Sequence, residues 1–487
     1  MNRKYQPIRI HTITLAIPAL LAGGCSEDEM AAHLDKRSQG DKPNVIFLLA
    51  DDLGWPQSGA YGSNYYHTPN MDRLAEQGVR FTNAYTAAAI CSPVRASIMT
   101  GKHPARLNIT DFIPGNQRDN YLLSQPDWQK HLPLEEYTLG NLFQDQGYRT
   151  AMFGKWHLSP IKFGPESLPF YPDKQGFDEY FVIDKPSTQH NPELDPHSSD
   201  MIGDRAVEFI REHRDRPFFL FGSFSAIHDP LVEQADSIFM WMEKPASSEP
   251  ENNPIIGAIL SRLDRNIGKM MDVLDETGLA DNTIFIFFSD NGGLAFNNVV
   301  YYFDDPELEM ASQTPLRKGK GWLYEGGIRV PLIVRWPGAV DSGFTSDEVV
   351  TSNDFMPTFS ELLGVEPKPD IDGTSMLTHL TDRVPLPERN HYWHYPHYHR
   401  GSGMLPGAAL RSGNWKLIEW YEQSIGGADG VALELYNLEN DLGETVNLAG
   451  MMDELAVELA ADLQRWREHV DAQMPVINSN YANINRN

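Results

Sequence analysis

Short apolar segments alternate with helix-like segments along the first three quarters of the chain. Residues 44–50, with the sequence NVIFLLA, are almost all apolar and end at two aspartates, which predicts a buried strand. Similar apolar segments occur at residues 150–153, 218–224, 283–289 and 331–335. The segments between them repeat apolar residues with the period of a helix, at residues 70–77, 139–146, 201–213 and 255–277. Strands that alternate with helices predict an α/β fold in which helices sandwich a large, mostly parallel sheet.

The pattern changes after about residue 370. Aromatic-rich segments separated by turn residues predict short strands at 391–398, 407–411, 415–421 and 433–438. Residues 452–470 have the amphipathic pattern of a helix. We therefore expect a main domain over residues 42–370 and a smaller C-terminal subdomain over residues 371–487, built from an antiparallel sheet and one helix.

The N-terminus has the pattern of an export signal. Basic residues precede an apolar segment at 13–21 that is too short to span a bilayer. The sequence LLAGGC then ends at Cys25 and resembles a bacterial lipobox, whose cysteine is lipidated and becomes the new N-terminus. A plain secretion signal with an incidental cysteine is the alternative.

Residues 1–25 therefore form the expected signal, and the polar residues 26–41 are expected to form a flexible tether. We expect an exported protein, in the periplasm or as an outer-membrane lipoprotein of a Gram-negative bacterium. Lipid on Cys25 is the only expected membrane anchor, because no later stretch of about 20 apolar residues occurs.

Charge and cysteine content narrow the classes of function. The 487 residues include 67 acidic and 40 basic side chains, which gives a formal net charge of −27. Nucleic-acid binding requires clustered positive charge, so no nucleic-acid partner is expected. An anionic substrate would need a site that is basic only locally. The two cysteines, Cys25 and Cys91, are too few for a disulfide network, which favours other roles for both.

Oxygen-rich side chains follow two of the expected strands. Asp51 and Asp52 follow the first strand, and Asp290 and Asn291 follow the strand at 283–289. Because ligands bind beyond the carboxyl ends of parallel strands, these side chains are expected to converge there. Either pair alone is more simply a helix cap or a turn. Together their oxygens suit a hard cation, with calcium expected and magnesium as the alternative.

The most informative segment is residues 91–102, CSPVRASIMTGK. Its Cys-x-Pro-x-Arg core, with Cys91 and Arg95, resembles the signature of the type I, formylglycine-dependent sulfatases of the alkaline phosphatase superfamily. The following MTGK departs conservatively from the Leu-Thr-Gly-Arg-like element of that family. In the family, a maturation enzyme oxidises the cysteine to formylglycine in the unfolded chain. A lone cysteine without further matches would more simply be a small buried apolar residue.

Further matches to the same family occur in order along the chain. The sequence GKWH matches its Gly-Lys-Trp-His element and implies catalytic roles for Lys155 and His157. Residues 316–331 match its Gly-Lys-Gly and Tyr-Glu-Gly-Gly elements and imply that Lys320 is the catalytic lysine. His228 falls where the family places a histidine that serves the leaving group. The resemblance also implies an alkaline phosphatase-like fold and a catalytic domain over residues 42–370.

The resemblance implies a mechanism for a sulfuric ester hydrolase. Formylglycine at residue 91 would be hydrated, one hydroxyl would attack sulfur, and the other would expel sulfate as the carbonyl re-forms. Arg95 and a calcium ion would hold the hydrate. The implied calcium ligands are Asp51, Asp52, Cys91, Asp290 and Asn291.

The implied roles of the remaining residues follow from this path. Lys155 and Lys320 would balance charge on the sulfuryl group. His228, with Lys320, would protonate the leaving alcohol, and His157 would contact the hydrate and assist elimination. Asp290 would accept the proton of the attacking hydroxyl.

Residues 391–400, HYWHYPHYHR, are dense in aromatic and imidazole side chains. The candidates for substrate binding are His394, His397 and Arg400. Because neighbours on a strand alternate faces, Trp393 and Tyr395 would then belong to the core. An aromatic strand packed in the core of the small subdomain, with its histidines in turns, is the equal alternative. The expected substrate is a sulfated polysaccharide or oligosaccharide fragment, ahead of a small aryl sulfate.

Two other functions stay open from the sequence. A phosphomonoester, phosphodiester or phosphonate hydrolase of the same superfamily would share the fold. An inactive carbohydrate-binding relative would result if the host did not oxidise Cys91. The expected partners are therefore a sulfated carbohydrate and a formylglycine-generating maturation enzyme.

Overall fold

A computed structural model describes residues 42–115, 120–160, 165–183, 194–244, 253–295 and 312–481. The expected signal and tether, with Cys25, lie outside these residues. From residue 43 onward the chain belongs to one structural unit. No helix within the described ranges combines the length and the apolar character needed to cross a membrane.

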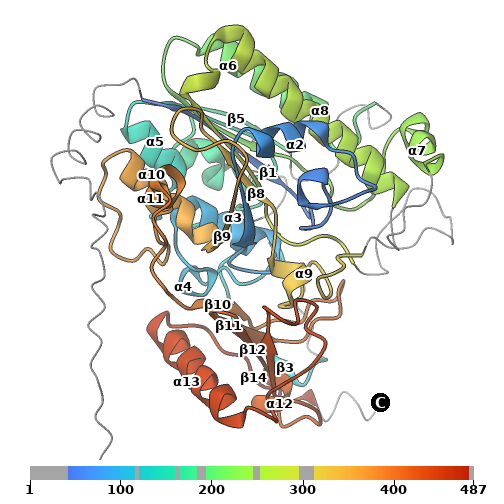
Figure 1. Cartoon of the computed structure of the whole chain (residues 1–487). Helices are drawn as coiled ribbons and strands as arrows, with labels where there is room; N and C mark the ends of the chain where they lie inside the picture. The colour runs from blue at the N-terminus through green and yellow to red at the C-terminus, as the bar shows by residue number, and fades with distance from the viewer. Residues whose placement is uncertain are drawn as a thin grey trace, which may run out of the picture. The chain divides into compact units, whose positions relative to one another are not determined.

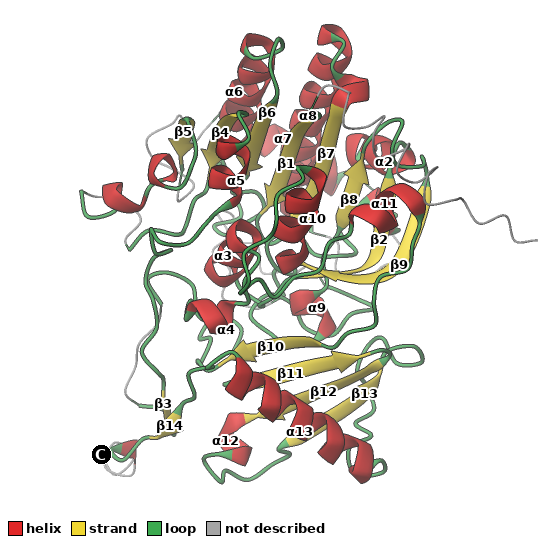
Figure 2. Ribbon diagram, turned by 90° about the vertical axis from the view of Figure 1, so that its left-hand side faces the viewer, coloured by secondary structure: helices red, strands yellow, loops and turns green. Residues whose placement is uncertain are grey.

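The main sheet has eight strands in the order β5-β4-β6-β1-β7-β8-β2-β9 (Figure 2), of which Figure 1 labels β1, β5, β8 and β9. Their bounds are β1 Asn44–Ala50, β2 Val79–Tyr85, β4 Arg149–Gly154, β5 Glu179–Val182, β6 Phe218–Ser223, β7 Thr283–Ser289, β8 Leu332–Arg335 and β9 Phe344–Thr351. Neighbouring strands in this sheet are parallel, except where β8 pairs with β7 and β2. The expected large, mostly parallel sheet is therefore confirmed, with β8 as its antiparallel member.

β1 lies inside this sheet, between β6 and β7, and is buried along its whole length. Val45 and Phe47 belong to the core on one face, whereas Ile46 and Leu48 belong to the core on the other. A strand covered on both faces needs apolar residues at successive positions, which explains its unbroken apolar sequence.

Helices cover both faces of the main sheet (Figure 2). The helices that share a core with Ile46 and Leu48 are α2 Pro69–Glu76, α6 Ser199–Glu212, α7 Ala235–Met242 and α8 Pro254–Thr277. The helices that share a core with Val45 and Phe47 are α3 Cys91–Thr100, α5 Leu139–Asp145, α10 Phe355–Leu362 and α11 Leu377–Asp382. The four helices expected from the sequence correspond to α2, α5, α6 and α8.

A second sheet, antiparallel throughout, follows the main one along the chain. Its strands are β10 His391–Tyr395, β11 Gly407–Ser412, β12 Trp415–Trp420 and β13 Leu433–Asn437. Helix α13, Asp453–His469, packs on one face of this small sheet. The other face contributes Trp393 and Tyr395 to a core that also contains Cys91. The expected small sheet with one helix is confirmed, and it contacts the region of Cys91 directly.

Short elements complete the described chain. They are η1 Gly59–Tyr61, α4 Pro104–Leu107, β3 Leu123–Ser124, η2 Leu168–Phe170, η3 Pro172–Lys174, η4 Ala280–Asn282, α9 Glu325–Ile328, η5 Ser352–Asp354, α12 Tyr421–Ser424 and β14 Val476–Ile477. β14 pairs with β3, so the last described strand returns to the loop that follows α4.

Candidate active site

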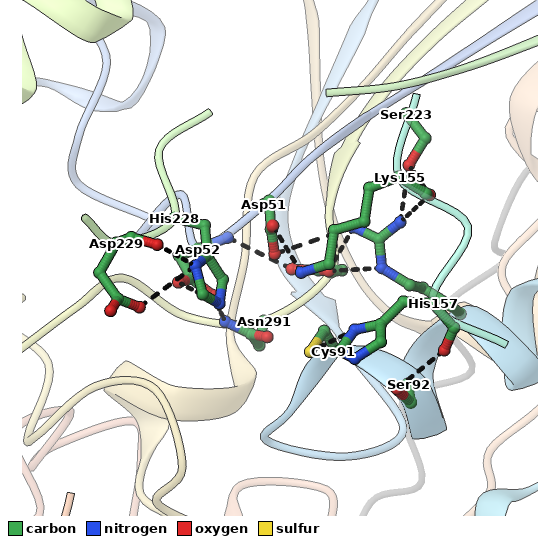
Figure 3. A network of polar contacts seen from close by, with 12 residues as sticks. Asp51, Asp52, Cys91, Ser92, Lys155, His157, Ser223, His228, Asp229 and Asn291 are labelled. Carbon is green, nitrogen blue, oxygen red and sulfur yellow. Dashed lines mark hydrogen bonds and ion pairs between the residues drawn. The ribbon is translucent and has the colours of Figure 1, made fainter. Parts of the chain in front are cut away.

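Three carboxylates meet where β1 and β7 end (Figure 3). Asp51 and Asp52 follow β1, Asp290 follows β7, and the register of the two strands places Ala50 opposite Ser289. One oxygen from each carboxylate lies within 4.8 Å of the others. All three side chains are fully buried. They converge as the order of strands and motifs predicts.

Two oxygens at this point are buried and have no hydrogen-bond partner among the described residues. They are Oδ1 of Asp51 and Oδ1 of Asn291. The amide of Asn291 donates to Oδ1 of Asp52 at 2.7 Å and to the Gly292 carbonyl at 2.9 Å, which leaves its own oxygen for another group. An unsatisfied buried polar atom costs about 1–3 kcal/mol. Carboxylate and amide oxygens arranged in this way fit a hard cation.

Each of the first two carboxylates has its own lysine. Nζ of Lys155 lies 2.6 Å from Oδ2 of Asp51. Nζ of Lys320 lies 2.8 Å from Oδ2 of Asp52. Both ammonium groups are buried, so they supply positive charge at low dielectric inside a protein that is acidic overall.

Arg95 fixes the third carboxylate. It lies on α3, one turn after Cys91, and its Nε and Nη2 donate to Oδ2 of Asp290 at 2.9 and 2.7 Å. Its Nη1 donates to the Lys155 carbonyl and to Oγ of Ser223, each at 2.6 Å. A buried guanidinium whose three nitrogens all donate hydrogen bonds is a rigid part of the site rather than a mobile side chain.

Burial and nearby charge shift the pKa of each carboxyl. Burial opposes ionisation of Asp51, yet the surrounding cations, Lys155 first, hold its pKa well below the usual range. Burial and the charge of Asp51 raise the pKa of Asp290 to about 7. Burial raises the pKa of Asp52, and Lys320 limits that rise. A cation placed among the three groups would lower the cost of ionising all of them.

Cys91 starts α3, and its side chain is buried beside an imidazole. Its Sγ lies 3.3 Å from Nδ1 of His157, and Nε2 of that ring lies 2.6 Å from the Ile113 carbonyl. A carbonyl only accepts, so Nε2 carries the proton and Nδ1 faces the sulfur as an acceptor. Burial raises the pKa of the Cys91 thiol, although Lys155 and Lys320 oppose this effect. Burial therefore disfavours the thiolate form of an unmodified Cys91.

His228 lies near Asp52, in the loop that follows β6. Its Nδ1 is 2.6 Å from the Asp229 carbonyl, to which it donates, and its Nε2 is 4.0 Å from Oδ2 of Asp52. Burial lowers the pKa of His228 to about 3, with further lowering by Lys320 and Lys155. The neutral ring thus presents an acceptor nitrogen toward the pocket that contains the lysines.

The expected substrate-binding residues do not gather at this site. His394 is buried, with Nδ1 2.8 Å from the Tyr421 hydroxyl and Nε2 3.0 Å from the Gln473 carbonyl. His397 is fully buried, with ring nitrogens 2.7 Å from Oγ1 of Thr110 and 2.9 Å from Oε1 of Gln125.

The expectation that these two histidines face a cleft is therefore wrong. Trp393 and Tyr395 are core residues as expected, but their face of β10 is the one that packs toward Cys91. The opposite face, with His394, is covered by the segments around Tyr421 and α13. Arg400 is exposed, in the loop that follows the strand.

The sequence did not single out His399, which lies beside the lysine loop. A Cβ added to Gly321 would lie 2.5 Å from Nδ1 of His399, so this ring packs on the backbone directly after Lys320. The Ser402 amide donates to Nδ1 at 3.2 Å, which places the proton of the neutral ring on Nε2. Burial and the charge of Lys320 lower the pKa of His399 to about 3. The only sequence signal was the density of histidines in this segment.

Comparisons with known proteins cover nearly the whole described chain. A family profile described as Sulfatase matches residues 43–365, and one described as N-sulphoglucosamine sulphohydrolase, C-terminal, matches residues 318–469. A protein of Formosa agariphila named Sulfatase is 29% identical, over 90% of this chain and 91% of the relative. Human arylsulfatase A is 30% identical, over 84% and 83%. An N-acetylgalactosamine-6-O-sulfatase of Bacteroides thetaiotaomicron is 27% identical, over 91% and 96%.

Solved structures share the fold. The crystal structure of Ps i-CgsB in complex with k-i-k-neocarrahexaose superposes with a TM-score of 0.73 and 26% identity, over 91% of this chain and 97% of that chain. A phosphonate monoester hydrolase of Agrobacterium radiobacter superposes with a TM-score of 0.66 at 18% identity, over 88% and 96%. The fold alone therefore does not show whether the substrate is a sulfate ester or a phosphonate ester. The chemistry of the site has to distinguish them.

Proposed function

The chain belongs to the sulfatase family and is a sulfuric ester hydrolase, and on this basis we propose that it removes sulfate from carbohydrates. The proposal includes formylglycine at residue 91 and one bound calcium ion. The observation that carries it is the buried cysteine at the start of α3, on which the charges of two lysines and two aspartates act at close range. A cysteine that served only as a small apolar residue would need none of these charges.

Four side chains would hold the calcium ion, together with an oxygen on the modified residue 91. They are Asp51, Asp52, Asp290 and Asn291. Two of their buried oxygens have no hydrogen-bond partner among the described residues, which supports a cation as an additional partner. Oxygen ligands of this type suit calcium, and magnesium is the alternative. When bound, the ion would polarise the sulfate ester and favour ionisation of a hydroxyl beside it.

Residue 91 and His157 would handle the proton that ends the reaction cycle. A formylglycine hydrate has two hydroxyls on one carbon, which provides both a nucleophile and a later exit for sulfate. Nδ1 of His157 faces residue 91 as an acceptor, so it can take the proton of one hydroxyl. Asp290, which the bound cation would keep ionised, is the proposed acceptor for the proton of the other hydroxyl.

The lysines and His228 would act on the sulfuryl group and the leaving alcohol. Lys155 and Lys320 carry buried positive charge next to the carboxylates, where it would stabilise charge that develops on sulfate oxygens. Lys320 would also act with His228 at the leaving oxygen. The low pKa of His228 reflects burial and these same lysines. A bound sulfate ester would offset the lysine charges, which lets Nε2 of His228 hold a proton and deliver it to the leaving oxygen.

Carbohydrate is the proposed alcohol part of the substrate. One relative is named for an N-acetylgalactosamine sulfate, and one similar structure contains a neocarrahexaose. An exported enzyme would meet sulfated polysaccharide fragments in the periplasm or at the outer membrane, where lipid on Cys25 would anchor it. A formylglycine-generating enzyme is the second proposed partner, and no nucleic-acid partner is proposed.

A phosphonate or phosphate ester hydrolase is the alternative function, because a phosphonate monoester hydrolase shares the fold. An inactive carbohydrate-binding relative is the alternative if Cys91 is never oxidised.

The test of the proposal is to follow modification of Cys91 and turnover together. Conversion to formylglycine lowers the intact mass by about 18 Da. We expect the rate of nitrophenyl sulfate hydrolysis to rise in proportion to the modified fraction. Cys91→Ala should show no turnover, while its unfolding temperature should stay close to that of the wild type. Wild-type rates in Cys91→Ala would contradict the nucleophile assignment.

A further inference from the structure

A buried cluster of charged side chains joins the small sheet to α9, the short helix that follows Lys320 in the sequence. Nζ of Lys416, on β12, lies 2.9 Å from Oε1 of Glu325 and 2.8 Å from Oε1 of Glu444. All three side chains are completely buried. The hydroxyl of Tyr85 donates to Oε2 of Glu325 at 2.6 Å. The proposed hydrolysis of sulfate esters uses none of the residues in this cluster.

Burial and the neighbouring cations act in opposite directions on the two carboxyls of the cluster. Burial opposes ionisation of both carboxyls, but Lys416, Arg329 and Arg411 lower the pKa of Glu325 to about 2. The pKa of Glu444 is raised by burial to about 7, although Lys416 opposes the rise. Buried ions cost several kcal/mol each and are often replaceable by apolar residues without loss of stability. Stability alone therefore gives little reason for this cluster, and a geometric role is the better account.

The helix α9 holds the loop that carries Lys320. The Gly326 amide donates to the Arg317 carbonyl at 3.0 Å. A Cβ on Gly327 would lie 2.0 Å from the Trp322 carbonyl oxygen, so the backbone there is in close contact with α9. Both ends of the loop that contains Lys320 are thus packed on α9.

The same helix holds the segment after β7. The Gly292 amide donates to the Gly327 carbonyl at 2.9 Å, and the Lys320 amide donates to the Gly293 carbonyl at 2.8 Å. The amide of Glu325, at the start of α9, donates in turn to Oε2 of Glu444 at 2.7 Å. A continuous set of contacts therefore runs from the small sheet, through α9, to the backbone of Lys320.

We propose that Lys416 and Glu444 are positioning residues, which clamp Glu325 and α9 and so hold Lys320 against Asp52. This inference rests on the proposed function, in which Lys320 balances charge close to the leaving oxygen. A misplacement of about 1 Å can cost a large part of a rate even when it arises far from the reacting atoms. The small sheet thus acts on the reaction through Lys320.

Lys416→Met tests this role through the dependence of rate on the leaving group. The probes are nitrophenyl sulfate and phenyl sulfate; phenol is the weaker acid, so its departure depends more on charge balance at the leaving oxygen. We expect kcat for phenyl sulfate to fall about 10-fold more than kcat for nitrophenyl sulfate, with KM nearly unchanged. Equal losses on both substrates, or no loss, would overturn the positioning role.

Glu325→Gln keeps the shape of its side chain and leaves Lys416 paired with Glu444, so it serves if Lys416→Met does not fold. The same selective loss is expected, at smaller size. The matched control is Glu419→Gln, which removes a charge from the 2.7 Å ion pair with Arg467 on the α13 side of the small sheet. It should lower the unfolding temperature without changing the ratio of the two rates. A changed ratio in this control would overturn the specific role, because general loosening would then suffice.

Crystal structures of these variants give a readout that does not depend on activity. Nζ of Lys320 should leave hydrogen-bond distance of Asp52 in Lys416→Met and keep it in Glu419→Gln. An unmoved Lys320 in Lys416→Met would overturn the inference, whether or not the protein hydrolyses any sulfate ester. A wild-type protein with no activity on sulfate esters would instead contradict the proposed function alone.

Discussion

The two histidines closest to the reacting groups have defined proton positions, set by the carbonyl that each ring contacts. His157 donates from Nε2 to Ile113, and His228 donates from Nδ1 to Asp229. Each neutral ring therefore presents an acceptor nitrogen to the pocket, one beside residue 91 and the other toward Asp52. This arrangement supports the proposed roles of His157 at the nucleophile and of His228 at the leaving group.

His228→Gln should separate these two roles. General acid catalysis typically contributes about 100- to 10,000-fold, so we expect a loss of that size on a sulfated sugar, whose alcohol needs a proton. The loss on nitrophenyl sulfate should be much smaller, because nitrophenolate leaves without protonation. Steady-state rates on both substrates measure the difference, and equal losses would contradict the assignment.

Most catalytic candidates could be predicted because their chemistry depends on residues that are neighbours in the sequence. The segment CSPVR carries Cys91 and Arg95 on one turn of α3, and the strand ends carry the acidic oxygens. His399 could not be predicted in the same way. Four histidines lie between residues 391 and 399, and only the tertiary fold decides which one packs beside Lys320.

At the scale of the elements, the segment that begins with β10 buries several uncharged histidines. Burial lowers the pKa of His394 and of His399 to about 3, and it lowers the pKa of His397 well below the usual value. In the unfolded chain a histidine has a pKa of about 6.5, so below that pH the unfolded state binds more protons than the folded state. The free energy of unfolding should therefore decrease as the pH falls from about 6.5 toward 3.

His394→Gln should make this pH dependence less steep. Each histidine that stays neutral in the folded state lowers the free energy of unfolding by up to about 1.4 kcal/mol per pH unit below 6.5. His394→Gln should abolish one such contribution. Chemical denaturation at pH 7, 6 and 5 measures the slope. The exposed His67→Gln is the control and should keep the wild-type slope. A wild-type slope in His394→Gln would contradict a buried, neutral His394.

The elements that the sequence predicted are those with a simple pattern of burial. β1, β6 and β7 are buried at every position and have unbroken apolar sequences. β5 and β9 form the edges of the main sheet, and their mixed burial hides them from a search for apolar segments. Alternation along β10 correctly grouped Trp393 with Tyr395. The alternation could not predict which face of β10 would contact the main domain, because that depends on where α13 packs.

At the scale of the whole molecule, the active site places three buried cations beside three buried carboxylates in an acidic protein. The net charge is −27, whereas the pocket contains the buried side chains of Arg95, Lys155 and Lys320. Positive charge at the site was expected from the sequence for an anionic substrate, and each of these cations is paired with one of the three carboxylates. These pairs join segments more than 100 residues apart, such as Lys155 with Asp51 and Lys320 with Asp52. Their geometry therefore depends on the packing of the complete sheet and of the small sheet beside it.

The central claim is that this pocket acts on sulfate rather than phosphate esters through a modified Cys91. The most direct measurement is kcat/KM of the calcium-loaded, formylglycine-containing protein on nitrophenyl sulfate and on nitrophenyl phosphate under the same conditions. The account predicts a clear preference for the sulfate ester, at least about 100-fold, that disappears in Cys91→Ala. A preference for the phosphate ester, or equal rates on both that survive in Cys91→Ala, would contradict it.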